Sequence, residues 1–115
     1  MNRISENLYL GNLQAAHDLQ SLKQHNITHI LQVANGVKPM FPKQFTYKVI
    51  SVADTSSQSL IRHFPAAISF IKDGMRQGAV LVHCFAGVSR SATVVIAYLM
   101  QEKKMYFQEA FKYAS

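Results

Sequence analysis

The chain has 115 residues, of which 49% are hydrophobic and 16% are charged, and its formal net charge is +6. These values predict one folded globular domain and exclude an intrinsically disordered chain. The positive charge favours acidic partners. The lysines and arginines are scattered and form no aromatic-rich basic patch, so nucleic-acid binding is disfavoured.

The sequence also limits the compartment and the cofactors. No apolar run approaches the roughly 20 residues of a membrane span, and Asn2 stands where N-myristoylation requires glycine, so no stable membrane anchor is predicted. Cys84 is the only cysteine, which excludes an internal disulfide and favours a reducing compartment, the cytoplasm and also the nucleus. No metal site or cofactor is predicted, because metal-ligand spacing is absent among His17, His25, His29 and His63.

The first third of the chain predicts two strands separated by a helix. Residues 7–12 predict a short edge strand that ends in a turn, and Asn12 can cap a helix over residues 13–25. Asn26 is expected to end this helix, and residues 27–34 predict the next strand. The inward face of the helix is expected to consist of Leu13, Ala16, Leu19 and Leu22.

The middle of the chain predicts loops around one further strand. Asn35 and Gly36 signal a turn, and the prolines within residues 37–44 predict an irregular loop. Residues 45–52 alternate and then become mostly apolar, which predicts a strand that runs into the centre of the sheet. The serine-rich residues 53–59 are expected to form a loop at its end.

Helical spacing returns from residue 60 onwards. Pro65 predicts a short turn first and a regular helix from about that residue, which Gly74 and Gly78 are expected to end. Another helix is predicted over residues 106–114. The alternation of strands and helices predicts an α/β fold, with a central, mainly parallel sheet flanked by helices on both faces.

The most informative pattern is a strand, a loop and a helix in succession. Residues 79–82 are apolar, as in a covered central strand, and residues 90–102 have helical spacing. Between these elements lies Cys84, followed six residues later by Arg90. A loop that enters a helix N-terminus directs backbone N–H groups at one point, and arginine can hold two oxygens of a phosphate. The pattern predicts an oxyanion site with a cysteine nucleophile for covalent phosphoryl or sulfuryl transfer.

The string His83-Cys84-x5-Arg90-Ser91 resembles the signature of the cysteine-dependent protein tyrosine phosphatases, and its full form resembles the dual-specificity branch. The resemblance extends from about Leu8 to the chain end. It implies a protein tyrosine phosphatase-like fold in which residues 1–115 form a single catalytic domain that lacks the C-terminal helical part of the family domain. Such a chain is expected to expose an apolar patch or to be completed by a homodimer.

The resemblance also implies roles for residues of the signature. Cys84 would be the nucleophile, although a lone cysteine is more often a small core residue. Ser91 would assist release of the thiolate, or simply cap the helix, and His83 would support Cys84 or be a structural histidine. The residues that bind the substrate phosphate would be Phe85, Ala86, Gly87, Val88, Ser89 and Arg90.

Hydrolysis needs an acid for the leaving oxygen. Of the six acidic residues, Asp54 directly follows a predicted central strand, and the phrase Val52-Ala53-Asp54-Thr55 resembles the general-acid loop of dual-specificity phosphatases. A turn or helix-capping aspartate is the alternative.

Neutral side chains in the signature loop distinguish the chain from phosphoinositide phosphatases, which place lysines there. The resemblance therefore implies hydrolysis of phosphotyrosine and of phosphoserine or phosphothreonine in proteins, with a signalling kinase as one possible substrate. Two alternatives are a catalytically impaired domain that only binds phosphoproteins, and a sulfurtransferase or arsenate reductase. The presence of Cys84, Arg90 and Asp54 argues against the first. The late position of the loop and the single cysteine argue against an arsenate reductase.

Overall fold

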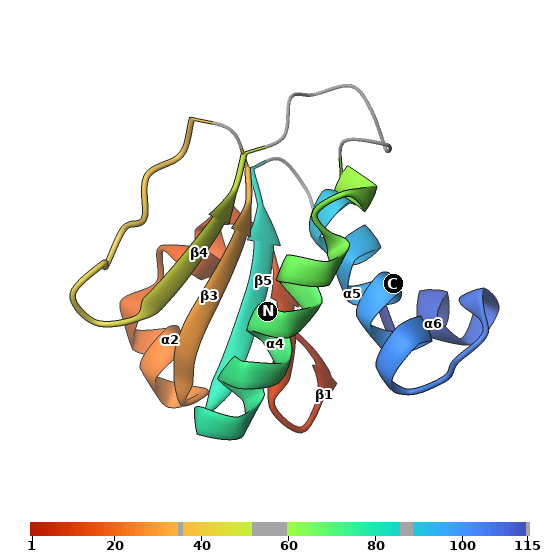
Figure 1. The fold of residues 1–115 in the computed structure, drawn as a ribbon. Helices are drawn as coiled ribbons and strands as arrows, with labels where there is room; N and C mark the ends of the chain where they lie inside the picture. Colours follow the sequence, from red (N-terminus) through yellow and green to blue (C-terminus); the bar gives the residue numbers. More distant parts are fainter. Residues whose placement is uncertain (35, 52–59, 86–88, 115) are drawn as a thin grey trace.

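A computed structural model describes residues 1–34, 36–51, 60–85 and 89–114. These residues form a five-stranded sheet in the order β1-β2-β5-β3-β4, with helices packed on both faces (Figure 1). The strands are β1 (Asn2–Ser5), β2 (Leu8–Gly11), β3 (Ile27–Val33), β4 (Thr46–Ile50) and β5 (Ala79–Cys84). The helices are α1 (Leu13–Ala16), α2 (Leu19–Gln24), α4 (Phe64–Gln77), α5 (Ser89–Glu102) and α6 (Phe107–Ala114).

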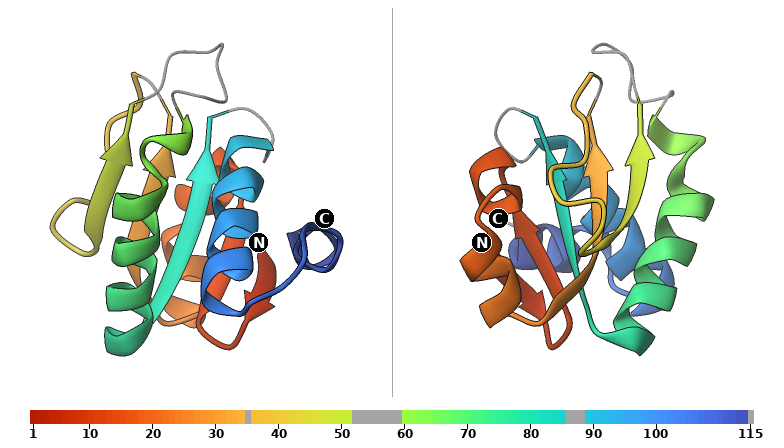
Figure 2. Two further views of the ribbon diagram at one scale, coloured as in Figure 1. Left: turned by 45° about the vertical axis from the view of Figure 1, so that its right-hand side comes forward. Right: turned by 90° about the vertical axis from the view of Figure 1, so that its left-hand side faces the viewer.

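The predicted mainly parallel sheet is confirmed. β5 lies in the centre and runs parallel to β2 on one side and to β3 on the other, while β1 is antiparallel to β2. Helices α4 and α5 pack on one face, and α1 and α2 pack on the other (Figure 2). Parallel strands place their carboxyl ends at one edge of the sheet, which is where ligands bind in open α/β folds.

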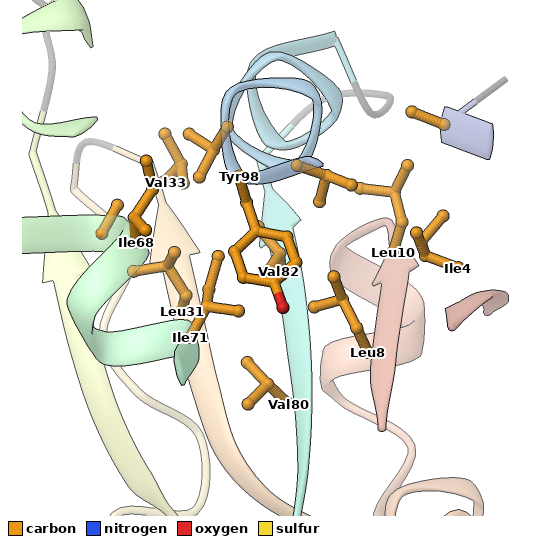
Figure 3. Packing of buried hydrophobic residues seen from close by; sticks show 14 of the residues in the cluster. Ile4, Leu8, Leu10, Leu31, Val33, Ile68, Ile71, Val80, Val82 and Tyr98 are labelled. Atoms are coloured by element: carbon orange, nitrogen blue, oxygen red, sulfur yellow. The ribbon is translucent and has the colours of Figure 1, made fainter. Parts of the chain in front are cut away.

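The larger core lies between the sheet and the α4/α5 layer. Every residue of β5 is buried, and alternate residues point to opposite faces. Val80 and Val82 therefore join the cluster beneath α5, where Tyr98 packs over them (Figure 3), whereas Leu81 joins the smaller cluster beneath α1 and α2. Strand β5 thus contributes side chains to the hydrophobic clusters on both faces of the sheet, as its apolar sequence predicts.

Two strand positions differ from the prediction. β2 is an interior strand, because Asn2–Ser5 forms an edge strand that its polar sequence does not signal. β4 lies at the opposite edge of the sheet and does not run into its centre. Its first four residues are exposed or only partly buried, and only Ile50 is fully covered, which fits a strand with a single neighbour.

The predicted helix over residues 13–25 is divided in two. Asn12 caps α1 by accepting a hydrogen bond from the backbone N–H of Ala15 at 3.0 Å, as predicted. Asp18 then caps α2 in the same way, through the N–H of Ser21 at 3.1 Å. A second N-cap inside the predicted helix therefore starts a new helix.

Helix α4 also differs from the prediction at one glycine. Pro65 lies in its first turn, as expected, and Gly78 caps its end, but Gly74 is buried within it. A Cβ atom at Gly74 would lie 2.5 Å from Cγ2 of Val80 and 2.9 Å from Cγ of His29. Gly74 therefore allows α4 to approach the sheet closely rather than ending the helix.

Helix α6 packs against α5 through Ala110 and carries aromatic side chains on its outer surface. Tyr106 is 81% exposed, and three further aromatic side chains are about half exposed: Phe107, Phe111 and Tyr113. These side chains are exposed, while the missing C-terminal part and the homodimer stay predictions. Within the described ranges, the helices are too short or too polar to span a membrane.

Candidate active site

The strand, loop and helix predicted from the sequence meet at the carboxyl edge of the sheet. Cys84 is the last residue of β5, and α5 begins at Ser89. The Cys84 side chain is almost fully buried and points to the α4/α5 face, where its Sγ lies 3.4 Å from the Oγ of Ser91. Ser91 is itself buried in the first turn of α5. The thiol therefore lies where the amino end of a helix can stabilise negative charge.

His83 points to the opposite face of β5. Its side chain is fully buried, with Nδ1 3.4 Å from the backbone carbonyl oxygen of Cys84, and Nε2 has no hydrogen-bond partner among the described atoms. Burial lowers the pKa of His83 from 6.5 to about 4, the Cys84 carbonyl opposes this shift, and the nearby His17 adds to it. His83 is therefore neutral at pH 7, and its Nδ1–H donates to the Cys84 carbonyl.

Arg90 lies beside Ser91 in the first turn of α5 and is partly buried. Phe85 and Ser89 are exposed at either end of the predicted phosphate-binding loop. The other loop residues of the prediction (Ala86, Gly87 and Val88) and the predicted general acid Asp54 lie outside the described residues. The structure thus brings together His83, Cys84, Ser91 and the backbone of Arg90, while the position of Asp54 stays a prediction.

Residues 8–115 match the family described as "Dual specificity phosphatase, catalytic domain". The chain belongs to this family. The resemblance drawn from the signature around Cys84 is thereby confirmed at the level of the whole domain.

Individual proteins agree with this assignment. The chain is 48% identical over 110 residues to "Dual specificity protein phosphatase 22-A" of Danio rerio, which covers 95% of this chain and 52% of that protein. It is 45% identical over 108 residues to "MAP kinase phosphatase with leucine-rich repeats protein 1" of Dictyostelium discoideum, covering 94% of this chain and 13% of that protein.

A solved structure shows the same architecture. The human "tyrosine phosphatase-like serine/threonine/tyrosine-interacting protein" superposes with a TM-score of 0.91 at 38% identity, covering 99% of this chain and 81% of that one. The chain spans about half the length of several curated relatives that it matches, between 47% and 56%.

The sequence analysis did not identify one buried polar residue beside the site. Gln32 is buried in β3, where it is the direct neighbour of His83 in β5. Its Nε2 donates a hydrogen bond to the carbonyl oxygen of Val37. This bond ties β3 to the segment that connects it to β4. The only signal was a polar residue inside an apolar strand.

The described residues contain no group of three or more His, Cys, Asp or Glu side chains that could hold a metal ion.

Proposed function

We propose that this domain is a protein phosphatase that hydrolyses phosphotyrosine and phosphoserine or phosphothreonine through a phosphocysteine intermediate. One observation carries the proposal: the Sγ of Cys84, at the end of the central strand, lies 3.4 Å from the Oγ of Ser91 at the amino end of α5. A nucleophile and a hydroxyl that can stabilise its leaving form are thus adjacent.

In the first step, backbone N–H groups of residues 85–90 and the guanidinium of Arg90 bind the equatorial phosphate oxygens. The Cys84 thiolate attacks phosphorus, so an S–P bond forms and the P–O bond to the substrate breaks. Asp54 gives its proton to the departing oxygen, which leaves as a neutral phenol or alcohol. This role for Asp54 rests on the family resemblance of its loop.

In the second step, Asp54 accepts a proton from water as the water oxygen attacks the phosphocysteine. A P–O bond forms, the S–P bond breaks, and inorganic phosphate is released. The hydroxyl of Ser91 donates a hydrogen bond to the sulfur as it becomes a thiolate again, which the 3.4 Å separation supports.

His83 acts on Cys84 through the backbone and does not touch the substrate. Its neutral imidazole donates to the Cys84 carbonyl and so holds the peptide group at the end of β5 in a fixed orientation. We assign it as a positioning residue.

The substrate class follows from the loop and from the relatives. The neutral side chains of the signature loop offer no extra cations for an inositol phosphate, so protein phosphoesters fit better. Because one matched relative is named a MAP kinase phosphatase, we propose a phosphorylated signalling kinase as substrate. A cytoplasmic or nuclear setting suits a chain with a single cysteine that is proposed to act as a thiolate.

The test is turnover of p-nitrophenyl phosphate and of phosphopeptides in the presence of a metal chelator. We expect turnover by the wild-type chain and none by Cys84→Ser. If the wild-type chain bound phosphopeptides without hydrolysing them, the binding-module alternative would replace this proposal.

A further inference from the structure

An exposed aromatic side chain directly follows the candidate nucleophile. Cys84 is 2% exposed, whereas Phe85, the next residue, is 58% exposed. The other strongly exposed aromatic side chains of the described residues are on α6 or directly before it: Tyr106, Phe107, Phe111 and Tyr113. Phe85 therefore stands apart from that patch, at the carboxyl edge of the sheet.

Ring–ring contacts within the described residues do not account for this position. The aromatic pairs in that part of the chain involve other rings: Tyr9 with His25, His29 with Phe70, Phe41 with Phe45, and Phe107 with Phe111. An exposed phenyl ring gains little of the free energy that burial gives elsewhere in the fold. A ring that becomes buried when a substrate binds would gain this free energy of burial during binding.

The position of Phe85 in the chain suits a substrate contact. Consecutive Cα atoms are about 3.8 Å apart, so the Phe85 backbone is adjacent to that of the nucleophile. A phosphate held over the buried Cys84 Sγ must carry its ester group outward, towards the exposed rim of the site. A phenyl ring on that ester reaches further towards the rim than the short alkyl group of phosphoserine, so of the two it is the better candidate to meet a phenylalanine there.

We propose that the Phe85 side chain packs against the aromatic ring of phosphotyrosine and biases this domain towards phosphotyrosine over phosphoserine. This inference rests on the proposed function and deepens it, since it names the preferred leaving group. The contact acts through the phenyl ring rather than through the phosphate, which both substrates share. Aromatic pairs of this kind are worth about two-fold to ten-fold in binding.

The experiment compares two phosphopeptides of identical flanking sequence, one with phosphotyrosine and one with phosphoserine. We expect Phe85→Ala to lower the ratio of their kcat/KM values by about three-fold to ten-fold, and Phe85→Tyr to preserve it. Phe111→Ala is the matched control, because Phe111 has a similar exposure of 52% but lies on α6. This control should leave the ratio unchanged. An unchanged ratio in Phe85→Ala, or an equal loss for both peptides, would overturn the inference.

A binding measurement separates this inference from the proposed function. Titration of both peptides into Cys84→Ser and into Cys84→Ser/Phe85→Ala needs no turnover. A phosphotyrosine preference that is lost with Phe85 supports the ring contact even if the wild-type chain is inactive. An active wild-type chain whose binding preference ignores Phe85 retains the proposed function and overturns only the inference.

Discussion

The α4/α5 layer and the α1/α2 layer cover the two faces of strand β5. The adjacent residues Cys84 and His83 point to different layers and therefore have different surroundings. Cys84 points to the α4/α5 layer and lies beside a serine hydroxyl at the start of a helix. His83 points to the other layer, where its Nε2 meets no hydrogen-bond partner among the described atoms. Both side chains are buried to a similar extent.

This difference shows that two side chains buried to a similar extent can have different chemical surroundings. The α4/α5 layer provides a helix whose first turn places the hydroxyl of Ser91 beside the thiol. On the α1/α2 side the imidazole of His83 is fully buried and lies near His17, and both effects lower its pKa and favour its neutral form. Four substitutions test this comparison.

The largest effect is expected at Cys84. We expect Cys84→Ser to lower turnover by more than about 10⁴-fold, because a serine hydroxyl is a far weaker nucleophile than a thiolate. Its unfolding free energy should stay within about 1 kcal/mol of wild type, since the side chains are similar in size. Steady-state kinetics in chelator and chemical denaturation give the two values. Substantial residual turnover would contradict the proposed role of Cys84 as the nucleophile.

Arg90→Lys comes next. We expect kcat/KM to fall by about 10²–10³-fold, because an ammonium group cannot make the two parallel hydrogen bonds of a guanidinium. Lys112→Arg, at an exposed position on α6, is the control for a change between the two cations. Kinetics near those of wild type for Arg90→Lys would exclude bidentate phosphate recognition.

His83 tests the other layer through the pH dependence of stability. Its pKa is about 4 in the folded protein and 6.5 ordinarily, so the unfolded chain binds the proton first as the pH falls. Folding stability is therefore complete above pH 6.5 and is lost as the pH falls towards 4, by about 3 kcal/mol. We expect His83→Gln to remove this part of the pH dependence of the unfolding free energy.

The control for this measurement is His29→Gln, since burial also lowers the pKa of His29. Denaturation of the wild type and both variants at pH 7 and pH 4 separates the two histidines. A pH dependence in His83→Gln equal to that of wild type would mean that His83 is not held neutral by the α1/α2 layer.

The smallest effect concerns the spacing of α4. We expect Gly74→Ala to lower the unfolding free energy by about 1–2 kcal/mol, because overpacking against Val80 and His29 exceeds the gain in helix propensity. Ser69→Ala, on the exposed side of the same helix, should change it by less than about 0.5 kcal/mol. Equal melting temperatures for the two variants would show that α4 can move outward at little cost.

The sequence predicts the centre of the fold better than its edges. The strand and helix around Cys84 each carry a clear periodicity, and the family signature joins them. The edge positions of β1 and β4 were not predicted, because strand order depends on pairing between distant segments. The polar Asn2–Ser5 gives no local strand signal.

The site shows the same limit. Local spacing was sufficient to relate Cys84 to Ser91, which are seven residues apart. His83 and Gln32 are neighbours because of the register between β5 and β3. The hydrophobic pattern of each strand does not determine this register. The close approach at Gly74 is likewise a property of helix-to-sheet distance, so its glycine was mistaken for a helix end.

The central position of β5 has a consequence for local opening. Among the described strands, β1 pairs with β2 alone, whereas β5 lies between two parallel neighbours. Edge strands open through small fluctuations, and central strands exchange their amide protons only in larger unfolding events. Amides of β1 should therefore exchange with solvent well before those of β5. Because the thiol and the Ser91 hydroxyl belong to one continuous segment that starts with β5, fraying at that edge leaves their separation unchanged.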